Sequence, residues 1–147
     1  MWAVDTRHLP LYWFPRECPR CTFWAGARTS DADLTWFLGG QRDLRVHVIE
    51  ESWLERVRDT RLYLYRMPGE SFTQDSAIAG YWTSRVIVDP LELVAVDDLI
   101  GRHAAAGIVL RTAANLWPLW DPVVASTLEF SGIRLHNALA RPQPSAG

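Results

Sequence analysis

The chain has 147 residues, a formal net charge of −2, and apolar residues at 48% of the total. This size suits a single domain, and these proportions are ordinary for a globular protein. The slight negative charge argues against general binding to nucleic acid or to a membrane surface, because both need an excess of basic residues. No uninterrupted apolar run approaches the roughly 18 residues of a membrane span, and no charged-then-apolar leader opens the chain. We therefore expect a cytoplasmic protein.

The sequence predicts short strands and helices that do not alternate strictly. Strands are expected at residues 2–4, 21–25, 45–50, 61–67 and 81–88, with a further apolar run at 93–96 and a strand that begins at 108–110. Helices are expected at residues 29–38, 52–59, 98–106 and 121–139, the last because Asp121 and Pro122 form a typical helix start. A loop rich in Gly, Ser and Asp is expected at residues 68–80.

This pattern favours an α+β fold around a mixed, bent or split β-sheet with about four helices. We expect one domain over residues 1–140 and a disordered tail over residues 141–147. The chain opens directly on the apolar strand at residues 2–4, which suggests that an upstream segment is missing.

Two features of composition bear on chemistry. Eight tryptophans indicate either a packed core with amphipathic edges or a pocket that stacks flat ligands. All 15 basic residues are arginine, which excludes a lysine Schiff base and a phosphate-loop lysine. The common signatures of serine hydrolases, phosphate loops and zinc proteases are also absent.

Residues 15–21 form the densest cluster of chemically active side chains. Cys18 and Cys21 have the C-x-x-C spacing of redox proteins, but a strand is predicted after them where a redox site needs a helix. A zinc site would need two further ligands, and two buried thiols that only pack in the core are the simplest interpretation. Arg16 and Arg20 suit a phosphate or carboxylate ligand, and internal ion pairs explain them equally well.

Two more places could carry function. Glu129 and His136 lie seven residues apart on the predicted last helix, where they could form a catalytic pair or satisfy internal hydrogen bonds. Tyr81, Ser84 and Arg85 follow the predicted loop at residues 68–80, and such loop ends often carry functional residues.

From residue 2 to residue 138 the chain resembles an uncharacterised family of small bacterial proteins, a domain of unknown function. The motifs that carry this resemblance are Trp2-Ala3-Val4, Pro15-Arg16-Glu17-Cys18-Pro19-Arg20, Ala79-Gly80-Tyr81-Trp82-Thr83-Ser84-Arg85 and Leu116-Trp117-Pro118-Leu119. Family members usually have a leading segment with a His and a Ser-Glu pair, and an apolar residue where Cys21 stands. The resemblance therefore implies a missing upstream segment and weakens the case for a cysteine pair site.

The order of short strands, with an aromatic strand around Tyr63 and Tyr65, is also similar to the ADP-ribosyltransferase-like fold. Enzymes of that fold bind NAD in a cleft between the two halves of a split sheet. The resemblance implies arginines on the pyrophosphate, an aromatic side chain against the nicotinamide, and a carboxylate beside the oxocarbenium-like centre. The expected contacts to NAD or a similar nucleotide are Arg16, Arg20, Tyr12, Tyr81 and Arg85, with Glu50 or Glu129 as the carboxylate.

Two alternatives remain open at this point. In the first, the chain is a non-catalytic binding or regulatory module. In the second, Cys18 and Cys21 make it a thiol redox or metal protein. The sequence defines neither the substrate nor the oligomeric state.

Overall fold

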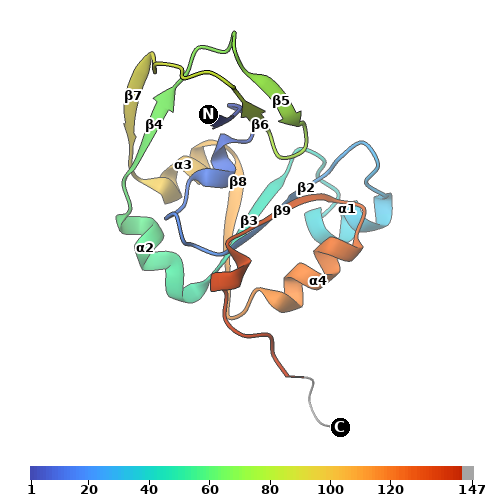
Figure 1. Ribbon diagram of the computed structural model, residues 1–147. Helices are drawn as coiled ribbons and strands as arrows, with labels where there is room; N and C mark the ends of the chain where they lie inside the picture. The colour runs from blue at the N-terminus through green and yellow to red at the C-terminus, as the bar shows by residue number, and fades with distance from the viewer. Residues whose placement is uncertain (144–147) are drawn as a thin grey trace.

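The computed structural model describes residues 1–143, and its centre is a four-stranded mixed sheet (Figure 1). The strand order is β8 (Ile108–Ala113), β3 (Arg45–Glu50), β2 (Arg20–Trp24) and β9 (Glu129–Ile133). β3 pairs with β8 in parallel, and the other two pairings are antiparallel. All five residues of β2 are buried, which explains why this strand reads as an apolar run rather than an alternating one.

Each face of this sheet packs on its own pair of helices. Cys21, Phe23 and Val48 project into a core closed by α1 (Asp31–Leu38) and α4 (Trp117–Ala125). Ile49, which is next to Val48 in β3, projects the other way, into a core shared with α2 (Leu54–Asp59) and α3 (Leu99–Ala105). This second face is also covered by the 3₁₀ turn η1 (Leu9–Tyr12) and by Phe14. Two more 3₁₀ turns are η2 (Glu51–Trp53) and η3 (Leu135–Asn137).

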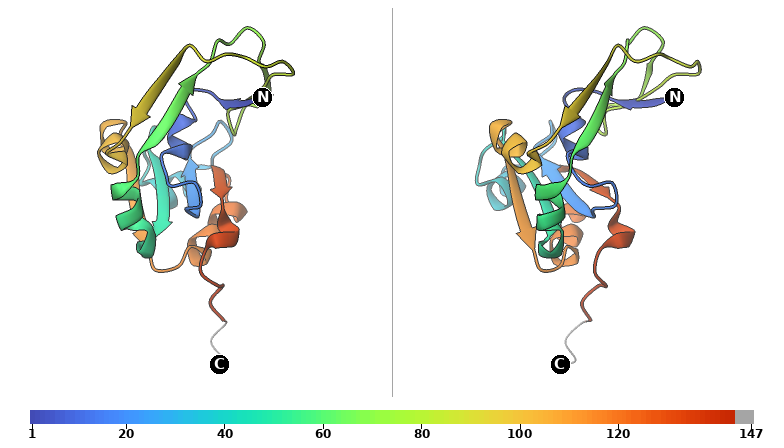
Figure 2. Two further views of the ribbon diagram at one scale, coloured as in Figure 1. Left: turned by 60° about the vertical axis from the view of Figure 1, so that its left-hand side comes forward. Right: turned by 90° about the vertical axis from the view of Figure 1, so that its left-hand side faces the viewer.

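Two smaller sheets extend the molecule beyond the central sheet (Figure 2). One is three-stranded, in the order β1 (Trp2–Val4), β6 (Tyr81–Thr83) and β5 (Thr73–Ser76). The other is the antiparallel ribbon of β4 (Leu62–Arg66) and β7 (Glu92–Val96). β1 thus pairs with a strand almost 80 residues further along the chain.

The expected α+β fold with about four helices and a split, mixed sheet is confirmed. The helix predicted at residues 121–139 is wrong: α4 starts at Trp117, with Pro118 in its first turn, and ends at Ala125. The residues after it form β9, because pairing with the buried strand β2 outweighs their helical spacing.

Three smaller differences concern the middle of the chain. The loop predicted at residues 68–80 contains β5, and the apolar run at residues 93–96 belongs to β7. The strand predicted at residues 81–88 stops at Thr83, because the Ser84 hydroxyl bonds to the backbone of Val86 and turns the chain. The tail expected at residues 141–147 lies for the most part outside the described residues. Within residues 1–143, the helices are too short or too polar to cross a membrane.

Candidate functional site

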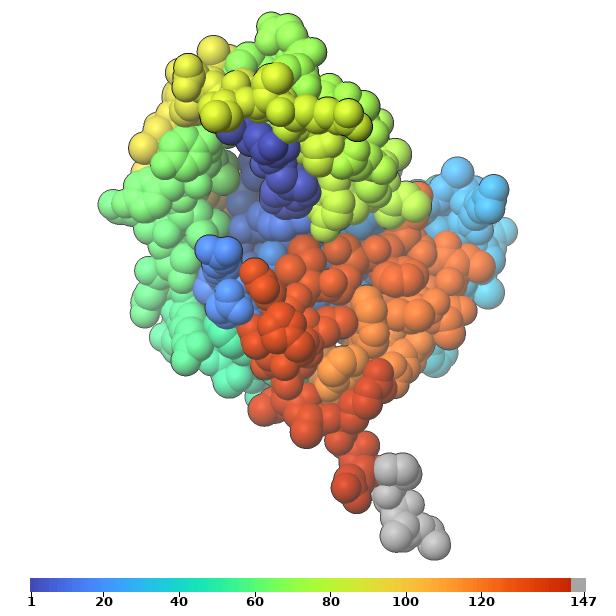
Figure 3. Space-filling view, in the orientation of Figure 1, coloured from blue at the N-terminus to red at the C-terminus, as the bar shows by residue number. Residues whose placement is uncertain are grey.

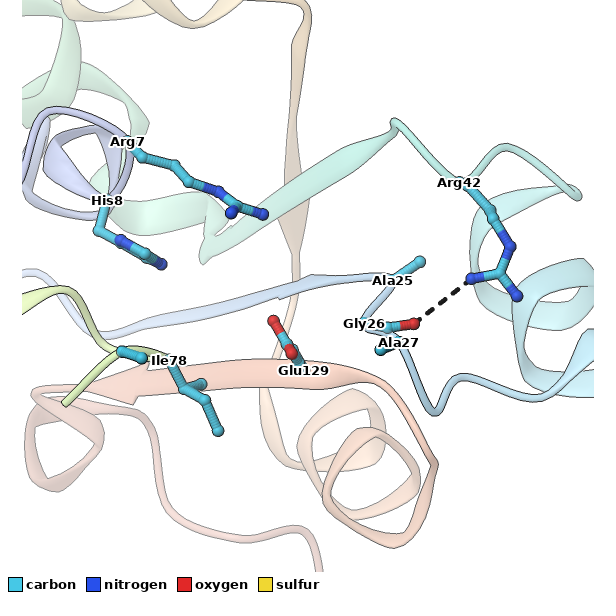
Figure 4. Close-up of a pocket in the computed structure, with 9 residues that line it drawn as sticks. Arg7, His8, Ala25, Gly26, Ala27, Arg42, Ile78 and Glu129 are labelled. Atoms are coloured by element: carbon cyan, nitrogen blue, oxygen red, sulfur yellow. Dashed lines mark hydrogen bonds between the residues drawn. The ribbon is translucent and has the colours of Figure 1, made fainter.

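A pocket of about 460 Å³ opens at one end of the central sheet, within the size range of small-molecule sites (Figure 4). Its walls come from the segment before η1, the end of β2, the loop before β3, the β5–β6 turn and the start of β9. The lining residues are Arg7, His8, Ala25, Gly26, Ala27, Arg42, Ala77, Ile78 and Glu129. We call it the His8 pocket. Figure 4 shows the side chains of Arg7 and His8 reaching in from one side and the Glu129 carboxylate rising from β9 to face them.

The His8 ring is held by a neighbouring carboxylate. Asp5 Oδ1 accepts hydrogen bonds from the His8 backbone N–H at 2.9 Å and from His8 Nδ1 at 2.8 Å. A carboxylate can only accept, so Nδ1 carries a proton, and the neutral ring keeps its lone pair on Nε2. Burial acts to raise the pKa of Asp5, but the hydrogen bonds from His8 and Trp82 outweigh it and hold that pKa below its ordinary value. Asp5 therefore orients His8 as a proton acceptor.

Gly80 closes the other side of this histidine. A Cβ at position 80 would lie 2.4 Å from His8 Nδ1, and the backbone there has φ +68, which favours glycine. The Gly80 carbonyl also accepts a hydrogen bond from the Asp5 backbone N–H at 3.0 Å. The Ala-Gly-Tyr motif of the sequence thus fixes the position of the Asp5–His8 pair.

Glu129 is the one carboxylate among the nine lining residues. It lies opposite Trp24 in the β2–β9 register, and Trp24 Nε1 donates to its Oε2 at 2.7 Å. A Cβ at Gly26 would come within 2.6 Å of Oε1, so the glycine leaves space for the carboxylate. Within residues 1–143, Oε1 accepts no hydrogen bond. One oxygen is therefore fixed, while the other is free to face a ligand.

Arg7 and Arg42 line the pocket, and Arg45 donates from just outside it to the Arg7 carbonyl at 2.8 Å. In the described part of the chain, none of these three arginines has an acidic side chain within ion-pair distance. Arg42 donates to the carbonyls of Gly26 at 3.3 Å and Thr29 at 3.2 Å, which anchors its guanidinium at the rim. Arg45 lies over the Trp24 ring, and its pKa is lowered by burial and by the nearby charge of Arg7. Such unpaired guanidinium groups favour an anionic ligand.

The structure brings three of the predicted nucleotide contacts together at another place. Arg20 is only 3% exposed, and its guanidinium lies 5.8 Å from the Tyr12 ring centre. Trp2 packs on both Tyr12, at 5.7 Å, and Tyr81, at 5.2 Å between ring centres. These residues form a cluster that does not line the His8 pocket.

The other predicted contacts lie apart from this cluster. Arg16 is exposed and lies beside Glu17, at 3.9 Å. Arg85 lines a second, hydroxyl-rich cavity of about 400 Å³ together with Ser71, Thr73, Asp75, Thr83 and Val86.

Glu50 and Glu129 were the two predicted catalytic carboxylates, and the geometry favours Glu129 for that role. Glu50 is buried, and its carboxylate accepts hydrogen bonds from the backbone N–H groups of Leu116 at 3.4 Å and Leu139 at 3.1 Å. It therefore anchors two segments of the chain to the end of β3. Glu129 and His136 do not share a helix, because Glu129 lies in β9 and His136 in η3.

The two cysteines are free and buried in different cores, Cys18 on one side of the central sheet and Cys21 on the other. Burial raises the pKa of each thiol to about 12. Thiolate, the reactive form, is therefore scarce at neutral pH. Among the described residues, no group of three or more His, Cys, Asp or Glu side chains is placed to hold a metal ion.

The sequence analysis did not identify Asp5, Arg7 or Arg42 as site residues. For His8, the sequence indicated a turn and, at most, a further ligand for a zinc site at the two cysteines. The Asp5-x-x-His8 spacing could have indicated the contact between these two residues, because an aspartate side chain in a turn can accept a hydrogen bond from a residue three positions later. No local sequence pattern indicated that Arg42 and Glu129 would line the same pocket.

The fold and the pocket together define an α+β protein with an arginine-flanked cavity that holds a histidine and a carboxylate. The chain belongs to a family of unknown function, DUF6886, whose model matches residues 1–138. No curated protein and no solved structure matches it.

Proposed function

We propose that this protein binds a small phosphorylated ligand in the His8 pocket, with a nucleotide such as NAD as the leading candidate, and acts on it by acid–base chemistry. The observation that carries the proposal is that one pocket holds the oriented His8 ring and the Glu129 carboxylate, which has one oxygen bonded to Trp24 and one without a hydrogen bond in residues 1–143. The arginines around the pocket have no acidic partner in the same described residues. The ADP-ribosyltransferase-like architecture inferred from the sequence is part of the proposal.

Each pocket residue has a role that its contacts support. Arg7 and Arg42 bind the phosphate oxygens, because a guanidinium matches their geometry and charge. The free oxygen of Glu129 stabilises positive charge that develops on a ribose ring in the transition state. His8 Nε2 takes the proton of the attacking hydroxyl, since Asp5 keeps the proton of the ring on Nδ1.

With NAD as the ligand, the bond from ribose C1′ to the nicotinamide nitrogen breaks. Its electron pair leaves with nicotinamide, which becomes neutral. Water or an acceptor hydroxyl forms the new bond to C1′ and passes its proton to His8. Charge and atoms balance without any further reactant.

Ligand binding is tested by thermal unfolding with NAD, ADP-ribose or inorganic pyrophosphate in excess. A ligand at about 100 times its dissociation constant adds about 2.7 kcal/mol to the free energy of unfolding. For a chain of this size that corresponds to a rise in Tm of about 5–10 °C. Arg7→Gln should reduce the shift, while Arg58→Gln, an exposed arginine on α2, should not. If none of the three ligands raises the Tm of the unchanged protein, the proposal fails.

Catalysis is tested separately from binding. Glu129→Gln keeps an acceptor for Trp24 Nε1 but removes the negative charge. We expect this variant to retain the Tm shift and to lose release of nicotinamide from NAD. If the unchanged protein binds NAD but releases no nicotinamide, the binding part stands and the chemical part is wrong.

A binding or regulatory module is the second candidate, and one observation favours it. Tyr63, Tyr65 and Leu93 are 59%, 62% and 55% exposed, and the β4–β7 register places all three on one face of the ribbon. Exposed aromatic and aliphatic side chains that cluster are typical of protein contacts. Sedimentation of the Tyr63→Ser, Tyr65→Ser double variant against the unchanged protein tests whether this face associates with a second copy. If both proteins remain monomeric at high concentration, self-association through the face is excluded.

A further inference from the structure

Arg20 is a buried cation whose hydrogen-bond partners in the described residues are all neutral. Its Nε donates to the Leu11 carbonyl and its Nη1 to the Cys18 carbonyl, both at 2.9 Å. In residues 1–143 no carboxylate pairs with it, and Nη2 has no hydrogen-bond acceptor. Among the described residues, the unpaired and fully enclosed side-chain nitrogens belong to Trp13 and His47. Arg20 Nη2 therefore keeps some contact with solvent, although the residue as a whole is only 3% exposed. Burial lowers the pKa of Arg20 only to about 10, which leaves the side chain charged at neutral pH.

A second guanidinium lies beside it. Ile133 is opposite Arg20 in the β2–β9 register, and Arg134 follows directly. Burial is the main cause of the lowered pKa of Arg20, and the positive charge of Arg134 adds to it. Its only acidic neighbour in the described residues is Glu17, whose Oε1 is 3.8 Å from Arg134 and 3.9 Å from Arg16. One carboxylate thus serves two arginines, and Arg20 remains uncompensated.

The backbone of Arg134 is strained. Its φ is +57, a left-handed conformation that costs a residue with a side chain on the order of 1 kcal/mol. Glycine would adopt this conformation without cost, yet an arginine occupies the position. Residues in such sparsely populated conformations cluster at active sites, ligand clamps and switch regions.

Aromatic side chains lie next to Arg20, whose guanidinium is 5.8 Å from the ring centre of Tyr12 and 5.0 Å from that of Phe14. Tyr12 and Tyr81 are half-buried, and Trp2 packs on both. Burial, followed by the interaction with Tyr81, raises the pKa of Tyr12 above its ordinary value, so its hydroxyl remains protonated at neutral pH. Figure 3 shows the surface drawn inward between the dark-blue residues of β1 and the orange residues at the end of β9.

We propose that Arg20 and Arg134, with the aromatic side chains of Tyr12, Tyr81 and Trp2, form a second anion site that binds an oxyanion carried on a flat ring. The arginines take the carboxylate or phosphate, and the aromatic side chains contact the ring. This site shares no residue with the lining of the His8 pocket. It therefore goes beyond the proposed function and does not depend on it.

Binding is measured by calorimetry or NMR titration with benzoate, acetate and inorganic phosphate. We expect benzoate to bind at least tenfold more tightly than acetate, because the two share the carboxylate and differ in the ring. Phosphate that binds as well as benzoate would show that the ring contributes nothing and would overturn the ring part of the proposal. Failure of all three probes at millimolar concentration would overturn the site.

Two variants locate the binding. Arg134→Gly removes the guanidinium and relieves the backbone strain, so it should fold and should weaken benzoate binding at least tenfold. Arg61→Gln is the matched control, because Arg61 is exposed and paired with Asp97 on the β4–β7 ribbon. Arg7→Gln should leave benzoate binding unchanged. If Arg7→Gln weakens it and Arg134→Gly does not, the anion lies in the His8 pocket and the second site does not exist.

Discussion

Two buried histidines should make the protein sensitive to acid well above the range in which carboxylates titrate. His103 Nδ1 bonds to the Leu99 carbonyl at 2.7 Å, which requires a proton on that nitrogen. His103 Nε2 is then the acceptor, at 3.0 Å, for a proton on His47 Nδ1. His47 Nε2 therefore carries a lone pair, and it is fully enclosed with no hydrogen-bond partner among residues 1–143. Both rings must be neutral in the folded protein.

The size of the effect follows from the pKa of each ring. Burial, with smaller contributions from His103 and Arg45, lowers the pKa of His47 well below its ordinary 6.5, and burial also lowers that of His103. Below pH 6.5 the unfolded chain therefore binds more protons than the folded one, so stability falls as the pH falls. Between pH 6.5 and the lowered pKa of each ring, the free energy of unfolding should fall by up to about 1.4 kcal/mol per pH unit for that ring. The pKa values of Asp5 and Asp33 are held below the ordinary value of an aspartate, so these two carboxylates affect stability mainly at lower pH than this.

Urea unfolding at several pH values between 7.5 and 4.5 measures this slope. His47→Gln removes one titrating ring and should flatten the slope by at least half. His136→Gln, which changes an exposed histidine on η3, should leave it unchanged. Equal slopes for the unchanged protein and His47→Gln would refute the tautomer assignment and the reasoning that follows from it.

Three further changes have expected outcomes. Gly80→Ala should lower the free energy of unfolding by about 1–3 kcal/mol, because the new Cβ meets the ring of His8 and the backbone is left-handed, and a urea midpoint unchanged from the native protein would contradict this. Cys18 and Cys21 should react with a thiol reagent in the native state at pH 8 far more slowly than in urea, because burial raises both pKa values, and rapid native labelling would count against the buried positions. Glu50→Ala should cost about 2–4 kcal/mol of unfolding free energy, since it leaves two backbone N–H groups without acceptors, and a loss below about 1 kcal/mol would show that water replaces the carboxylate.

Local pattern was enough to predict the elements whose signals are local. The strands at residues 2–4 and 45–50 have the predicted bounds, and Ser30 caps α1 as expected, accepting from the Asp33 N–H at 3.2 Å. The region after Pro122 could not be predicted in this way. Its apolar spacing fits a helix, and only the long-range pairing of β9 with β2 determines that it is a strand.

In the candidate site, too, the contacts that depend on long-range strand pairing could not be predicted from local sequence pattern. Glu129 was identified as a possible catalytic carboxylate, but on a helix with His136 as its partner. Its actual partner is Trp24, which is 105 residues away in sequence. Pairings of that range depend on strand register, which one sequence does not specify.

The parallel pairing of β3 with β8 has a consequence for how the chain folds. The connection between these neighbouring strands, residues 51–107, contains both helices of one face, the whole β4–β7 ribbon, and two strands of the outer sheet. The two ends of the segment 51–107 must come together before β8 can pair with β3. β9 must then pair with β2, on the other side of β3. Closing such long loops costs chain entropy before the strand contacts can stabilise the fold. We therefore expect folding in the millisecond-to-second range, with the β2–β3 pair, which is closer in sequence, formed first.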